Sequence, residues 1–121
     1  MFTGQPQQAL HSIEVVMRLN PTPPNYCWIL QGHAFYQLRR YEEAARAFER
    51  TTAPRRPYVY RYLAACYAQI GRLAEARALA SDSLRLQPAF TLHVWAQTEP
   101  YEFQADLDHM LDGLRKAGLP E

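Results

Sequence analysis

The 121-residue sequence has few cysteines, almost no net charge and no long apolar segment. Its two cysteines, Cys27 and Cys66, are too few for the disulfide framework of a small secreted domain, so we expect both to be reduced, as in the cytoplasm. The net charge of +1 gives no general attraction to nucleic acids or acidic membranes. No apolar run reaches the length that spans a membrane, and no segment has the pattern of a signal peptide. These absences predict a cytoplasmic domain that binds neither nucleic acid nor membrane.

Patterns that indicate catalysis or metal binding are also missing. The histidines are scattered, and neither an HExxH sequence nor a pair of cysteines at ligand spacing occurs. The five glycines form no phosphate-binding loop, and no serine has the sequence context of a nucleophile elbow. We therefore predict no catalytic residue, no metal site and no cofactor in this chain.

The strongest positive signal is a motif that occurs twice, 32 residues apart. Each copy has a large residue, a small residue four positions later and an aromatic residue three positions after that, followed by a turn and a second small residue. The spacing of the first three puts them on one helix face. A period of this length predicts a solenoid of helix pairs. The copies are Trp28, Gly32, Phe35, Tyr41, Ala44 and Phe48, then Tyr60, Ala64, Tyr67, Leu73, Ala76 and Ala80.

Small residues and turn residues mark the expected helix contacts and helix ends. Gly32 is unfavourable in a helix interior, so we expect a neighbouring helix to approach closely there, and Ala64 takes the same position in the second copy. Gly71 suits a turn between helices, because glycine adopts a positive φ at little cost. Pro88 ends the second pair, since proline cannot continue a helix interior.

These motifs resemble the tetratricopeptide repeat, a helix pair of about 34 residues. Residues 25–56 match as one repeat and residues 57–90 as a second. Ala64 and Tyr67 agree closely with the family pattern, whereas Arg39 stands where glycine is usual. The resemblance implies an all-α fold, a tetratricopeptide-like antiparallel helix-pair solenoid that forms a single domain over residues 1–121.

The two ends of the chain extend this pattern to about two and a half repeats. Residues 4–21 match the second helix of a truncated earlier repeat, and Phe2 falls where the missing first helix would end. A natural N-terminal helix is the alternative interpretation. Residues 91–121 carry an amphipathic helix followed by Gly118, and we expect this segment to be the C-terminal cap that a solenoid needs.

The segment from Asp106 to Pro120 also resembles the C-terminal tetratricopeptide region of bacterial class III adenylate/guanylate cyclases and of related winged-helix signalling regulators. The resemblance implies a protein-protein interaction or self-association module of a bacterial signalling protein, non-catalytic by itself. The alternative is the regulatory C-terminal part of a nucleotide cyclase, an enzyme whose metal-binding carboxylates would lie in a domain outside this chain.

In this repeat class the first helix of each pair lines a concave groove. Aromatic side chains beside an arginine are typical of interface hot spots, so a protein, a peptide or another domain of the parent is the expected ligand. The alternative is that the C-terminal helix folds back and fills the groove with Leu107, Met110, Leu111 and Leu114. The groove positions are Tyr26, Ile29, Leu30, His33, Tyr36 and Gln37, then Tyr58, Arg61, Tyr62, Ala65, Ala68 and Gln69.

The expected N-terminal helix offers a second binding surface. One of its sides packs on the next repeat, while the other lacks the partner helix of its own repeat and leaves an apolar patch. We therefore expect a homodimer through this helix, with a two-fold interface. The apolar residues are Ala9, Leu10, Ile13, Val15, Val16, Met17 and Leu19.

Two arginine pairs, Arg39-Arg40 and Arg55-Arg56, are candidates for a nucleic-acid patch. Both fall at expected turns, and Glu42, Glu43 and Glu49 lie close to them in sequence. A phosphate-binding surface would cluster basic residues away from acidic ones. We therefore interpret the pairs as turn residues.

Overall fold

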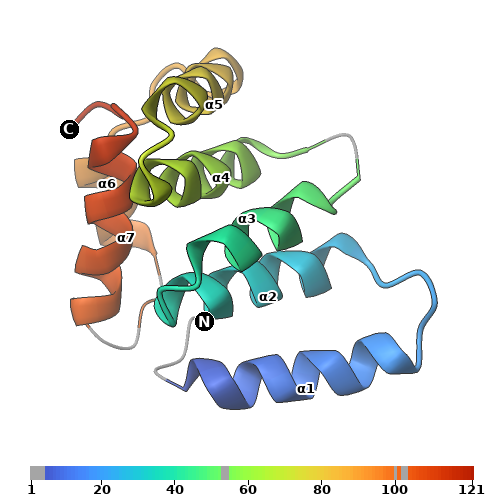
Figure 1. Cartoon of the computed structure of the whole chain (residues 1–121). Helices are drawn as coiled ribbons and strands as arrows, with labels where there is room; N and C mark the ends of the chain where they lie inside the picture. Colours follow the sequence, from blue (N-terminus) through green and yellow to red (C-terminus); the bar gives the residue numbers. More distant parts are fainter. Residues whose placement is uncertain (1–4, 53–54, 100, 102–103) are drawn as a thin grey trace.

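The structure is a computed structural model that describes residues 5–52, 55–99, 101 and 104–121. These residues form seven α-helices and no β-strand, which confirms the predicted all-α helical-repeat fold (Figure 1). Phe2 lies outside the described residues. The helices are α1 (Pro6–Arg18), α2 (Asn25–Gln37), α3 (Tyr41–Glu49), α4 (Pro57–Ile70), α5 (Leu73–Leu86), α6 (Leu92–Thr98) and α7 (Gln104–Lys116).

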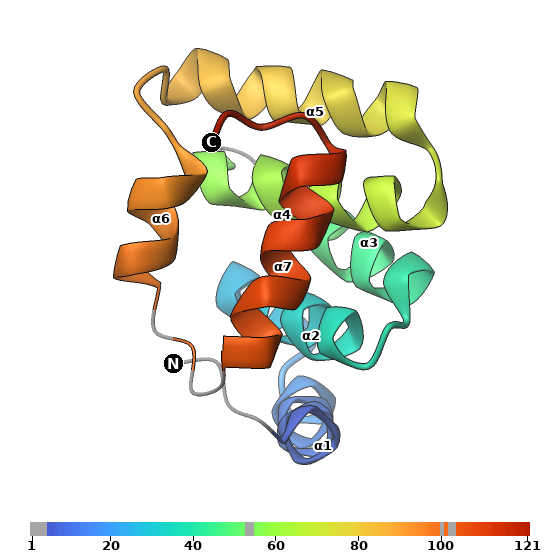
Figure 2. The ribbon, with the colours of Figure 1, turned by 90° about the vertical axis from the view of Figure 1, so that its left-hand side faces the viewer.

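The first five helices form a stack of antiparallel neighbours. Helix α2 packs against α3 and α4 against α5, while the contacts of α1 with α2 and of α3 with α4 join these units. Helix α7 runs along the stack, across α2 and α4, and α6 lies beside it (Figure 2). The C-terminal segment therefore covers the side of the stack on which the first helices of the pairs are aligned.

The contact between α2 and α3 depends on Gly32. A Cβ atom at this position would lie 2.6 Å from the ring of Phe48, which is fully buried. Only glycine allows the two helices to approach so closely, as the sequence predicted. In the second pair Ala64 is fully buried as well.

The turns between paired helices use left-handed backbone conformations. Gly71 follows α4 with a φ of 94°, which confirms the predicted glycine turn. Arg39, where the family usually has glycine, adopts a φ of 62° between α2 and α3. This conformation costs a residue with a side chain about 1–2 kcal/mol. The first pair therefore forms its turn at a cost that the second pair avoids.

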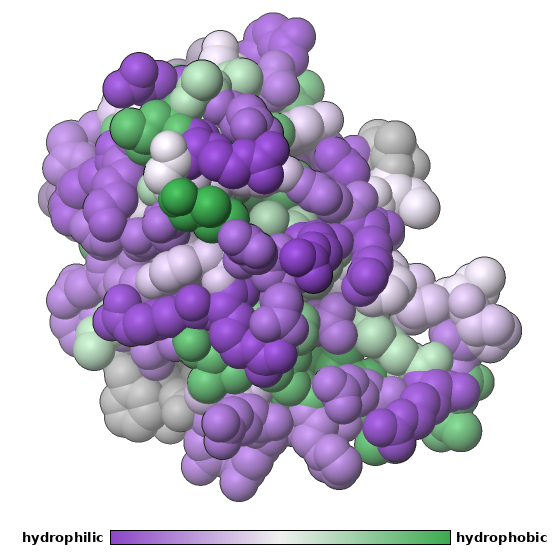
Figure 3. Space-filling view, viewed as in Figure 1, coloured by the Kyte–Doolittle hydropathy of each residue, from purple (hydrophilic) through white to green (hydrophobic). Residues whose placement is uncertain are grey.

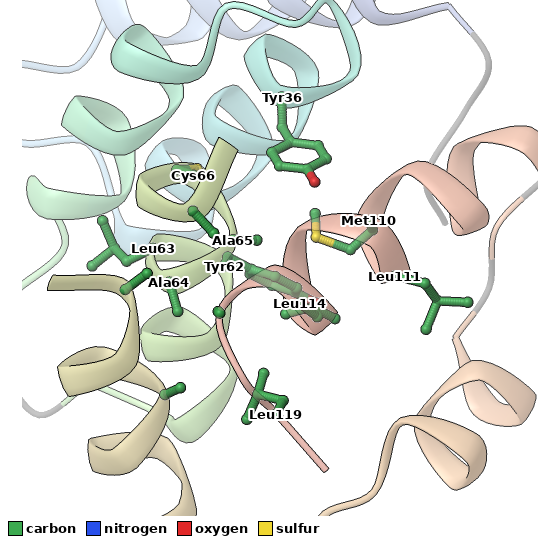
Figure 4. Close-up of a cluster of buried hydrophobic side chains, with 14 of the residues drawn as sticks. Tyr36, Tyr62, Leu63, Ala64, Ala65, Cys66, Met110, Leu111, Leu114 and Leu119 are labelled. Carbon is green, nitrogen blue, oxygen red and sulfur yellow. The ribbon is translucent and has the colours of Figure 1, made fainter. Parts of the chain in front are cut away.

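One hydrophobic core joins the repeats to the C-terminal helix. Figure 4 shows Tyr36 of α2 and Ala65 of α4 facing Met110 and Leu114 of α7. Met110 is 1% exposed and Leu114 is fully buried. Helix α7 is therefore part of the core.

The end of the chain returns to the start of α6. The backbone N–H of Leu92 donates to the carbonyl of Pro120 at 2.9 Å, and that of His93 donates to the carbonyl of Glu121 at 3.0 Å. The side chain of Thr91 accepts a hydrogen bond from the Val94 N–H at 3.3 Å and caps α6. These two bonds tie the residues after α7 to the N-terminal end of α6.

Candidate functional site

The predicted groove residues lie on α2 and α4, and α7 covers part of them. Tyr36 and Tyr62 retain 1% and 3% of their exposed area. A Cβ atom on Gly113 of α7 would collide with the Tyr36 hydroxyl and lie 3.0 Å from Cβ of Ala65. Glycine therefore lets α7 lie directly on the groove, which is the filled arrangement that the sequence analysis kept as an alternative.

Polar contacts hold α7 in place around the hydroxyl of Tyr36. This hydroxyl donates to the carbonyl of His109 at 2.8 Å and accepts from the Gln69 side chain at 3.1 Å. Gln69 also donates to the carboxylate of Asp112 at 3.1 Å, and Lys116 donates to the Gln69 side-chain carbonyl at 3.0 Å. We call these four side chains and the His109 carbonyl the cap contact.

The imidazole of His109 extends the cap contact to α3. Its Nε2 atom lies 2.7 Å from the hydroxyl of Tyr41, and its ring lies over Tyr36 with the centroids 4.5 Å apart. Burial, together with the nearby charge of Arg39, lowers the pKa of His109. The sequence did not single out this histidine, because its two aromatic neighbours lie far away along the chain.

His33, another predicted groove residue, is buried between aromatic rings. Its ring centroid lies 4.2 Å from that of Tyr62 and 5.8 Å from that of Phe48. Burial lowers the pKa of His33 to about 3. The imidazole is therefore neutral at physiological pH and serves as part of the core.

The most exposed of the predicted groove residues lie in the first half of α2. Tyr26 is 59% exposed and Leu30 is 40% exposed. Ile29, Gln37 and Tyr58 are half-buried. The structure thus separates the predicted groove into a part covered by the cap and an accessible part that includes Tyr26 and Leu30.

Arg61 is the charged residue among the predicted groove positions. It is only 6% exposed, and its Nη1 atom donates to the side-chain carbonyl of Gln87 at 2.9 Å. The guanidinium lies over the ring of Phe90, 4.2 Å from its centroid. Burial lowers the pKa of Arg61 and raises that of Glu99. The repeat pattern identified Arg61, but it contained no signal for Phe90 or Gln87, which lie on the turn after α5.

The apolar residues of α1 divide between two faces. Leu10 and Ile13 are buried and hold the helix on α2. Val15, Val16 and Leu19 are 41%, 45% and 83% exposed. The expected apolar patch is therefore present, although Ile13 does not belong to it.

One arginine of each pair is engaged near its turn. Arg40 forms a bidentate ion pair with Glu43, at 2.7 and 2.6 Å. Arg55 donates to the carbonyl of Glu49 at 2.9 Å. In the described part of the chain, no three histidine, cysteine or acidic side chains are grouped to hold a metal ion. None of the described helices is both long and apolar enough to cross a membrane.

The helix pairs of the stack agree with a comparison against protein-family models. The model of the tetratricopeptide repeat matches residues 29–89, half of the chain. The chain belongs to the tetratricopeptide repeat family. A search of curated proteins found no match. Tetratricopeptide domains generally mediate protein-protein interaction and are not catalytic, so the family membership supports a binding role for this chain.

Proposed function

We propose that this tetratricopeptide domain is a protein-binding module that self-associates through the exposed face of α1. The observation that carries the proposal is the patch of Val15, Val16 and Leu19, which lies at the end of the stack and has no partner helix in the described part of the chain. A solenoid buries such a face against the next helix. A second copy of the same helix offers a complementary apolar surface by two-fold symmetry.

The size of the patch predicts weak, concentration-dependent association. Complete burial of one valine or leucine side chain is worth about 1.5–3 kcal/mol, and these side chains are already partly covered. Two copies together contribute six side chains, while association costs at least about 4 kcal/mol. The balance favours a dimer at high protein concentration.

Light scattering over a concentration series tests this proposal. We expect the average mass of the unaltered chain to rise with concentration. A variant with Val15→Ser and Leu19→Ser should stay monomeric, while a control with Leu73→Ser and Leu86→Ser, two exposed leucines of α5, should still associate. A strict monomer, or a dimer that survives the α1 changes, would exclude this interface.

The accessible part of the groove is a proposed site for a protein or peptide partner. Tyr26 and Leu30 of α2 are exposed, and Ile29 of the same helix and Tyr58 of α4 are half-buried. Tyrosine is enriched among residues that dominate binding energies. Within the predicted groove, Tyr26 and Leu30 are therefore the first positions to vary once a partner is found.

The proposed setting of this module is a bacterial signalling protein, with a nucleotide cyclase as one possible parent. The support is the resemblance of residues 106–120, which here form most of α7 and the segment after it. The test is the coding sequence upstream of Met1, where an in-frame cyclase or winged-helix domain is expected. The purified chain should make no cyclic nucleotide from ATP or GTP, and measurable turnover would contradict the non-catalytic assignment.

A further inference from the structure

We infer that Met17 is a site of oxidation to methionine sulfoxide, and that the side-chain amide of Gln31 is placed to bind the sulfoxide oxygen. Met17 lies near the C-terminal end of α1, and Gln31 lies on α2, the helix on which α1 packs (Figure 1). The inference concerns the contact between these two helices and does not depend on the association of two copies.

Gln31 is a buried amide at a position that suits an apolar side chain. The equivalent residue of the second repeat, 32 positions later, is Leu63, which is 1% exposed. Gln31 is 8% exposed, and its Oε1 atom is buried without a hydrogen-bond partner in the described part of the chain. Burial of an unpaired amide oxygen is unfavourable. Leucine would therefore be the more stable choice if packing alone decided this position.

The nitrogen of the same amide faces a thioether. The Nε2 atom of Gln31 donates to the Sδ atom of Met17 at 4.0 Å. A thioether sulfur is a weak acceptor, so this contact stabilises the position of α1 only slightly. Among the described residues no ion pair joins α1 to α2. The amide of Gln31 is thus a donor that lacks a strong acceptor on the α1 side.

Met17 is more accessible to an oxidant than Met110. The side chain of Met17 is half-buried, whereas Met110 is 1% exposed and lies in the core. Met1 lies outside the described residues. Because the oxidation of a side chain follows its exposure, we expect a small oxidant to reach Met17 long before Met110.

Hydrogen peroxide is the oxidant that we assign to this step. A lone pair of the Met17 sulfur attacks one peroxide oxygen, so the S–O bond forms while the O–O bond breaks. The hydroxide that leaves takes the proton of the transferred oxygen and becomes water. The sulfur loses two electrons, the peroxide gains them, and the products are the sulfoxide and one molecule of water.

The contact with Gln31 has room for the new oxygen. An N–H···O hydrogen bond spans about 2.7–3.2 Å between its heavy atoms, so an oxygen bonded to Sδ fits within the 4.0 Å that separates Sδ from Nε2. Oxidation then replaces a weak contact to sulfur by an N–H···O hydrogen bond. A sulfoxide usually disrupts an apolar contact. Here we expect the oxidised α1 to stay on α2, because Gln31 supplies a donor that leucine lacks.

Peptide mapping by mass spectrometry tests which methionine reacts. The full chain is exposed to dilute hydrogen peroxide, and the peptides that contain Met1, Met17 and Met110 are measured separately. We expect Met17 to be oxidised at least about tenfold faster than Met110, which reacts only when the core opens. Met17→Leu should abolish oxidation in its own peptide and leave that of Met110 unchanged.

Two-dimensional NMR of the dilute protein tests the new hydrogen bond. Oxidation should shift the side-chain NH₂ resonances of Gln31, and Gln31→Leu assigns these resonances by removing them. The resonances of Gln7, an exposed glutamine of α1, serve as the internal control and should stay in place.

Deuterium exchange of the α1 amides tests the role of Gln31. In the unaltered chain, oxidation should change the exchange rates by less than about twofold, because the sulfoxide has a donor. In Gln31→Leu, oxidation should speed exchange about tenfold or more, the loss expected for a buried acceptor without a partner. This variant should fold, since Leu63 fills the equivalent position. The matched control Gln7→Leu should respond to oxidation like the unaltered chain.

Three results would overturn the inference. They are equal oxidation rates of Met17 and Met110, unmoved Gln31 resonances, and the same acceleration of exchange in the unaltered chain and in Gln31→Leu. All measurements use dilute, monomeric protein, so their outcome is independent of self-association through α1.

Discussion

The two ends of the helix stack differ in how much of their apolar surface is buried. At the C-terminal end, α7 buries Met110 and Leu114 on the repeats and adds the cap contact around Tyr36. At the N-terminal end, α1 buries Leu10 and Ile13 on α2, but Leu19, directly after the helix, is mostly exposed. Figure 3 shows how polar and apolar residues are distributed on one face of the molecule. The difference is that α7 completes the core, while the outer face of α1 stays exposed in the described part of the chain.

The largest test of this comparison replaces one leucine at each end by alanine. Leu114→Ala should lower the free energy of unfolding by about 2–5 kcal/mol, because it leaves a cavity in the core. Leu19→Ala should change it by less than about 0.5 kcal/mol, because its side chain is mostly in solvent. Urea denaturation of the dilute, monomeric protein measures both. Equal losses in the free energy of unfolding would show that the two leucines do not differ in burial.

A smaller effect should follow from the close approach of α7. Gly113→Ala would normally stabilise a helix by about 1 kcal/mol, but here the methyl group meets the Tyr36 hydroxyl and should cost about 1–3 kcal/mol. In the background of Tyr36→Phe the same change should cost less, because the hydroxyl is gone. Denaturation of the two single variants and the double variant measures this coupling. Additive losses would mean that α7 does not rest on Tyr36.

The smallest expected effect is a loss of stability in mild acid. The pKa of His33 is about 3 in the folded protein against 6.5 for a free histidine, so the unfolded chain binds the proton first. Stability should therefore be constant above about pH 7 and fall by about 1 kcal/mol by about pH 5.5. His33→Phe should remove most of this loss. His109→Gln should remove a smaller share, since the pKa of His109 is also lowered. A chain with His33→Phe that kept the full acid sensitivity would contradict this assignment.

Much of the stack could be predicted from the sequence because local spacing determines it. The small residue at Gly32 indicated the contact with the next helix, and Gly71 indicated the turn after α4. Both features depend on residues that are close along the chain. The same applies to Thr91, which caps α6 from within its own segment.

The groove was harder to predict because its state depends on contacts between distant segments. The sequence named Tyr36 and Arg61 as groove residues, but it could not decide between an open groove and one filled by α7. His109 meets Tyr41 across 68 residues, a pairing that no periodicity encodes. The contact of Arg61 with Phe90 depends on the turn after α5, which the repeat pattern does not specify.

The hydrogen bonds between the end of the chain and the start of α6 have a consequence for local unfolding. Because the carbonyls of Pro120 and Glu121 accept from the first N–H groups of α6, α6 and α7 cannot separate fully while these bonds remain. The amide hydrogens of Leu92 and His93 should then exchange with solvent deuterium together with those of α7, as one cooperative unit. The two amides thus report, from outside the groove, how often the cap opens.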